Sequence, residues 1–184
     1  MIVVRPETYT KVSYESAAIA TLAQRALESV APLPDDLDVT VEVEEDAATN
    51  RVRITALEPL VFGVDGGALE DYKRPRSLGD LASSITFTRL FLEVVDRQSD
   101  SFGAPELDAE MTQARRMAWD VNLYGRVGRH GLRLHQPRYR YNFRNRHGFS
   151  DVADRAFDQL WAGDELTWAE IVALSDGALD AVVT

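Results

Sequence analysis

Apolar residues recur at helical spacing in five stretches of the chain. In residues 13–30 they follow one another every three or four positions, which is typical of the buried face of a helix. Pro32 then ends this helix. The same spacing predicts four more helices, at 77–97, 105–124, 150–161 and from 167 onwards.

The starts of three of these helices carry capping residues. Ser77 and Ser150 stand just before the first apolar position of their helices, where a side-chain oxygen can accept from a free backbone N–H. Thr167 and Glu170 have the spacing of a capping box. These signals fix where the helices begin more firmly than the apolar spacing alone.

Two stretches alternate apolar and polar residues instead. Residues 37–45 and 51–57 both have the two-residue period of a half-buried strand, and 46–50 between them suits a turn. We therefore predict an antiparallel hairpin over 37–57. It would place the outward acidic side chains of one strand opposite the outward basic ones of the other, Glu42 and Glu44 against Arg51 and Arg53.

These elements predict an α+β fold, with about five helices packed on a small antiparallel sheet that contains the hairpin. The length of 184 residues and the 45% hydrophobic content suit one compact domain over 1–184. Residues 58–76 have no sustained period and are rich in glycine and proline, so we predict a long loop there.

Charge changes this picture at one place. Between Val121 and Ser150 the chain has seven arginines, all three of its histidines and no acidic residue. The other 154 residues carry 13 basic and 30 acidic side chains, and the net charge of the whole chain is −10. We call residues 126–147 the arginine segment. Its composition requires a partner, which could be the protein's own acidic surface, another subunit or an anionic ligand.

Within the arginine segment, residues 138–144 alternate strictly between two kinds of side chain. Tyr139, Tyr141 and Phe143 would face one side, and the arginines and an asparagine the other. This pattern predicts a strand with an aromatic inner face and a guanidinium outer face, or else an extended loop held by its aromatic residues.

Motifs for several enzyme classes are missing. The chain has no cysteine, which rules out a thiol nucleophile, a disulfide and a cysteine metal site. It has no HExxH, GxSxG or P-loop motif, and His130, His135 and His147 have no carboxylate among them to complete a metal site. We predict no metal and no cofactor, and we assign no catalytic residue.

A helix-rich chain with one small sheet and a long central helix resembles the layout of small zincins. In that family the central helix bears metal-binding histidines, whereas residues 78–97 here contain none. The resemblance therefore implies a layout and carries no function over to this chain.

Three functions stay open for the arginine segment. The leading hypothesis is a non-catalytic interaction module that docks an acidic protein surface or another copy of itself. The first alternative is an enzyme that acts on a phosphorylated or carboxylated small molecule, with arginines binding the anion and a histidine moving the proton. The second alternative is RNA binding, which the acidic net charge disfavours. The candidate residues are the same throughout: Arg138, Arg140, Arg144, Arg146, His135 and His147.

Localisation rests on weaker signals. No apolar run approaches the ~18 residues of a membrane span, and the first residues do not form a signal peptide, so we expect a soluble cytoplasmic protein without a membrane partner. Eighteen arginines against two lysines suggest a GC-rich bacterial genome.

Overall fold

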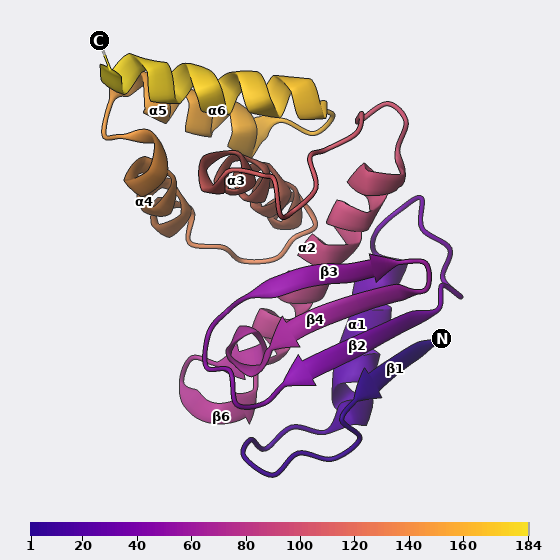
Figure 1. Cartoon of the computed structure of the whole chain (residues 1–184). Coiled ribbons are helices and arrows are strands. Elements are labelled where there is room, and N and C mark those ends of the chain that lie inside the picture. Colours follow the sequence, from indigo (N-terminus) through magenta and orange to yellow (C-terminus); the bar gives the residue numbers. More distant parts are fainter. Residues whose placement is uncertain (184) are drawn as a thin grey trace. The chain divides into compact units, whose positions relative to one another are not determined.

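The computed structural model describes residues 1–183, and their side chains as far as residue 179. Its contacts divide the chain into two compact units, Met1–Val95 and Asp96–Thr184 (Figure 1). The α+β class is confirmed. The description contains six α-helices instead of five, and the assignment of the whole chain to one domain stays a prediction.

The first unit is built on a four-stranded mixed sheet with the order β1-β2-β4-β3. Its strands are β1 (Ile2–Arg5), β2 (Val39–Glu44), β3 (Val52–Leu57) and β4 (Leu60–Asp65). β1, β2 and β4 run parallel, and β3 is antiparallel to β4. The helices α1 (Ser16–Glu28) and α2 (Asp80–Gln98) lie behind the sheet as drawn in Figure 1.

The predicted hairpin joins the wrong strands. β2 and β3 form as the alternation indicates, but β4 lies between them, and the hairpin of the sheet connects β3 to β4 through Glu58 and Pro59. Because β2 pairs with β4, Glu42 and Glu44 do not lie opposite Arg51 and Arg53 as predicted. Arg53 instead crosses Gly63 of β4, with its Nε 3.1 Å from where a Cβ would lie, and pairs with Asp65 at 3.7 Å.

The predicted loop at 58–76 is also wrong, because most of it is regular. It contains β4, a 3₁₀ turn η1 (Gly66–Leu69), and the small antiparallel pair β5 (Glu70–Asp71) and β6 (Arg74–Leu78). β4 is the central strand, buried along nearly its whole length, and Phe62 meets Phe91 of α2 with ring centroids 5.2 Å apart. A strand buried on both faces has no polar alternation, which is why its period was not recognised.

The second unit contains four helices besides the last turn of α2: α3 (Gln113–Arg129), α4 (Gln136–His147), α5 (Asp151–Ala162) and α6 (Trp168–Val183). Two predicted starts are confirmed. The Ser150 hydroxyl accepts from Ala153 N at 3.1 Å, and Thr167 and Glu170 exchange the two bonds of a capping box, at 2.8 and 3.3 Å. The helix predicted from residue 105 begins only at Gln113, because Thr112 supplies its cap, accepting from Arg115 N at 3.2 Å.

The core of this unit is aromatic. Trp119 of α3 is fully buried and lies 5.5 Å from both Phe102 and Trp168 between ring centroids. Its indole N–H donates to Asp96 at 2.9 Å, and Arg126 also donates to Asp96, at 2.7 Å. Arg126, one of the seven arginines of the acid-free stretch, therefore has a buried internal partner. Within the described residues, no helix is long and apolar enough to cross a membrane.

Candidate interaction surface on helix α4

The part of the arginine segment that was predicted to be a strand is helix α4. Pro137 occupies its first turn, where a missing N–H does no harm. The side chains that turn inward are Tyr139, Phe143 and His147, which are four residues apart and so share one face of a helix. The aromatic inner face predicted for a strand is therefore wrong for Tyr141, which points outward and is 58% exposed.

Two of the predicted site arginines are bound to α5. The Arg144 guanidinium binds the Asp154 carboxylate through two hydrogen bonds, donating from Nε to Oδ1 at 2.7 Å and from Nη2 to Oδ2 at 2.6 Å. Arg140 donates to Asp158, and its guanidinium lies 4.4 Å from the centroid of the Phe157 ring. The hydrogen bond from Arg144 lowers the pKa of the Asp154 carboxyl. Arg140 and Arg144 thus hold α4 against α5.

His147 is buried and belongs to the core. Its Nδ1 lies 3.2 Å from the Phe143 carbonyl oxygen and its Nε2 lies 2.9 Å from the Ser175 hydroxyl. Since a carbonyl can only accept, Nδ1 carries the proton and Nε2 accepts from Ser175. This is the arrangement of a nucleophile and its base, but both side chains are 0% exposed, so a substrate could not reach them. Burial lowers the pKa of His147 and favours its neutral form.

The other predicted histidine lies at the opposite end of the helix. His135 precedes α4 and is exposed. Eleven residues separate it from Arg146, which is about 16 Å along a helix axis. The structure therefore does not bring a histidine and the four predicted arginines together into one anion site.

What remains exposed along the outward side of this helix is a mixed set of basic, polar and aromatic side chains. Arg138, Tyr141, Asn145 and Arg146 face outward, and Phe149 follows directly after the helix. Tyr141 and Phe149 meet edge to face with centroids 6.0 Å apart, and Phe149 is 66% exposed. We call these five residues the α4 face. Sequence reasoning missed Tyr141 and Phe149, although the spacing 138, 141, 145 is a helical signal.

Arg138 and Arg146 differ from the other arginines of α4. Neither has an ion pair or hydrogen bond among the described side chains, in contrast to Arg140 and Arg144. Arg129, at the end of α3, is likewise occupied, because it donates to the carbonyl oxygens of Trp161 and Gly163 at 2.7 and 2.8 Å. The basic charge still available in α4 is therefore carried by Arg138 and Arg146.

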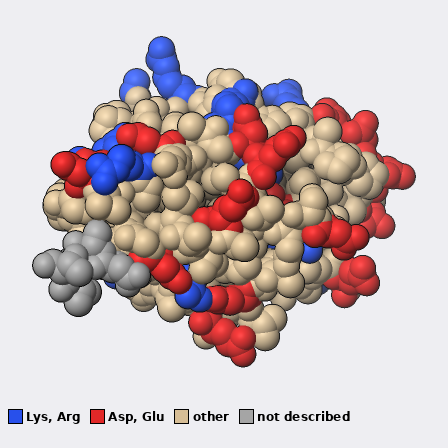
Figure 2. All heavy atoms as spheres, turned by 90° about the horizontal axis from the view of Figure 1, so that it is seen from above, with Lys and Arg blue, Asp and Glu red and all other residues tan. Residues whose placement is uncertain are grey.

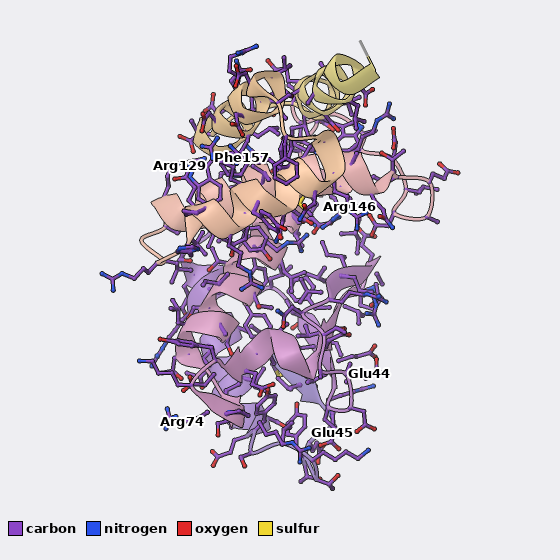
Figure 3. All side chains as sticks on the ribbon, turned by 90° about the vertical axis from the view of Figure 1, so that its left-hand side faces the viewer. Glu44, Glu45, Arg74, Arg129, Arg146 and Phe157 are labelled. Carbon is purple, nitrogen blue, oxygen red and sulfur yellow. The ribbon has the colours of Figure 1, made fainter. Side chains whose placement is uncertain are left out.

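A hollow of about 280 Å³ lies beside Arg146. Its other walls come from the start of α3 and from the residues just before it: Asp108, Met111, Gln113, Arg116, Met117 and Asp120. In Figure 3, Arg146 lies at one end of α4 and Arg129 at the other side of the view. No histidine lines this hollow, and in the part of the chain whose side chains are described no group of three His, Asp or Glu could hold a metal.

Seen from above, the side that carries α5 and α6 shows many Asp and Glu side chains, with Lys and Arg side chains beside them at a few places (Figure 2). Comparison with family models, with curated proteins and with solved structures gives no match to the chain. Function therefore has to be argued from the surface itself.

Proposed function

We propose that this protein is a non-catalytic interaction module whose α4 face docks a protein segment that presents carboxylates. The observation that carries the proposal is the pairing of the arginines. Arg140 and Arg144 are paired with α5, whereas Arg138 and Arg146 are exposed and have no ion pair among the described residues, and the same helix side exposes the rings of Tyr141 and Phe149.

The chemistry of the face suits a protein partner. Arginine and aromatic residues are enriched where protein interfaces concentrate their binding energy. A guanidinium binds a carboxylate through two parallel hydrogen bonds, and a face without acidic side chains of its own does not compete for them. Tyr141 and Phe149 are already in contact, so little side-chain entropy is lost when they are covered.

The two alternatives have less support. An enzyme that moves a proton with a histidine needs that histidine at the anion site, but His147 is closed off and His135 lies at the far end of α4. RNA binding needs several phosphate contacts to overcome the repulsion from a chain of net charge −10, and α4 offers only Arg138 and Arg146 for them.

The test compares two charge reversals of equal size. Arg138→Glu with Arg146→Glu removes the basic charge of the α4 face. Arg25→Glu with Arg155→Glu is the matched control, since both arginines are exposed, on α1 and α5, and neither has an ion pair in the described residues. The probe is a short fluorescent peptide of glutamate with one central leucine, and its anisotropy is measured at low and at high salt.

We expect the unaltered protein and the control to bind the peptide, and the α4 variant to bind at least about tenfold more weakly, which corresponds to one lost ion pair of about 1.4 kcal/mol. Equal binding by all three proteins would refute the proposal. A concentration-dependent mass in light scattering that the α4 variant abolishes would identify a second copy as the partner. Tighter binding of single-stranded RNA than of the peptide would replace the proposal with the RNA alternative.

A further inference from the structure

The hollow beside Arg146 is small and has two methionines in its lining. Its volume, about 280 Å³, is just below the range of about 300–1,000 Å³ that small-molecule pockets occupy. Met111 and Met117 provide its apolar lining, and both are half-buried. Methionine is flexible and polarisable, so such a lining adapts to apolar side chains of differing shape.

The acidic groups of the hollow already have partners. Arg116 lies 3.3 Å from Asp120 and 3.7 Å from Asp108, and Arg97 also pairs with Asp108. Arg97 and Arg116 are held in place, because their guanidiniums lie 5.0 and 5.1 Å from the Trp119 ring centroid. These charges therefore balance one another inside the protein.

Arg146 is the exception among the charged side chains of this lining. It is exposed, and it has no ion pair or hydrogen bond among the described residues. Its guanidinium stands at an apolar hollow whose own carboxylates are already paired, so the missing complement is an anion from outside the unit. Arg146 also belongs to the α4 face, which makes the hollow continuous with the surface described above.

From this juxtaposition we infer that the hollow binds one apolar side chain of the partner segment, and that a carboxylate next to that side chain in the segment binds Arg146. The inference rests on the proposed function and narrows its partner class to an acidic segment with an apolar residue beside an acidic one. Affinity then comes from the arginines, and selectivity for the apolar residue comes from the methionines.

The test is a double-mutant cycle with two peptides. One is the fluorescent glutamate peptide with a central leucine, and the other carries alanine in its place. We expect the leucine peptide to bind the unaltered protein about tenfold more tightly, because the extra apolar surface leaves water. Met117→Ala should reduce that preference to less than about threefold, since it removes half of the methionine lining.

Arg146→Gln is the companion variant, and its side chain is exposed, so folding does not depend on it. It should weaken both peptides by the same factor and leave the leucine preference unchanged. Circular dichroism checks the fold of both variants. If Met117→Ala fails to fold, Gln113→Trp at the exposed start of α3 replaces it, and this bulky side chain should block the leucine peptide selectively.

The outcomes separate the two claims. If the leucine and alanine peptides bind equally well, and the charge-reversal variant of the α4 face weakens both, the inference about the hollow is refuted and the proposed interaction module is retained. A leucine preference that survives both the methionine and the tryptophan variant would place the apolar residue elsewhere and also overturn it. Absence of binding by either peptide would overturn the interaction module, and the hollow with it.

Discussion

Gly125 of α3 lies directly against the backbone of Trp161 in α5, so replacing it tests how these two helices pack in the second unit. A Cβ at this position would lie 2.1 Å from the carbonyl oxygen of Trp161 and 2.9 Å from its carbonyl carbon. Carbon–oxygen contacts in proteins rarely fall below about 3.3 Å. Gly125→Ala therefore forces the two helices apart by about 1 Å.

The cost follows from what that separation breaks. Overpacking in a core costs about 1–3 kcal/mol. Asn122, just before Gly125 on α3, also donates to carbonyls at the end of α5: its Nδ2 lies 3.0 Å from Leu160 O and 2.7 Å from the O of Gly163, which follows the helix. A weakened buried hydrogen bond costs about 1 kcal/mol, and alanine regains about 1 kcal/mol of helix propensity. We expect a net loss of about 1–3 kcal/mol in the free energy of unfolding.

Gly128→Ala is the matched control on the same helix. The nearest atom to its Cβ would be Leu134 Cδ1 at 3.7 Å, an ordinary contact, so this variant should gain up to about 1 kcal/mol. The assay is urea unfolding followed by tryptophan fluorescence, because all three tryptophans lie in the second unit. A Gly125→Ala protein as stable as Gly128→Ala would refute the close crossing of α3 and α5.

Three further predictions concern stability. Burial lowers the pKa of His147, so the unfolded chain binds a proton at this residue more readily than the folded protein does. The contribution of neutral His147 to stability is therefore fully present above the usual imidazole pKa of 6.5 and is lost as the pH falls through the lower folded pKa. Thermal melts at a series of pH values should show this loss, and His147→Gln should reduce it. Asp154→Asn removes the carboxylate that binds the Arg144 guanidinium and should lower the melting temperature. Because this pairing lowers the pKa of Asp154, its stabilisation is present above the ordinary carboxyl pKa of 3.8 and is lost in more acid solution. An unchanged melting temperature would show that α5 does not hold α4 through this pair. Thr167→Ala removes the capping partner of Glu170 and should cost about 1 kcal/mol in urea unfolding, with serine at the same position restoring it.

Local signals in the sequence located most of the amphipathic helices, although Ser77, predicted as a cap, lies in β6 and α2 begins only at Asp80. The spacing of α1 and α2, the Ser150 cap and the Thr167 capping box all describe interactions within a few residues of the chain. Which strands pair is a long-range property. β2 and β3 are neighbours in sequence, but β4 displaces β3 from β2 because its side chains are buried and bring more apolar contact to the sheet centre.

The prediction that the site arginines lie on a strand was wrong for a different reason. Residues 138–144 fit the two-residue period of a strand. Tyr139, Phe143 and His147, which turn inward, also fit the four-residue spacing of a helix, and only tertiary packing decides between strand and helix. Arginine is a good helix former, and α5 supplies the acids at helical spacing, Asp154 and Asp158. The sequence had left the protein's own acidic surface open as a partner, and Asp154 and Asp158 are that partner for Arg144 and Arg140.

The position of Asp96 has a practical consequence for cutting the chain into fragments. This residue lies in the last turn of α2 and is the acceptor for both the Trp119 indole and the Arg126 guanidinium. A recombinant fragment that starts after α2 would leave two donors without a carboxylate in its own core. A fragment for spectroscopy or isotope labelling should therefore keep the final turns of α2, and a protease cut between residues 98 and 112 is expected to give an unstable C-terminal product.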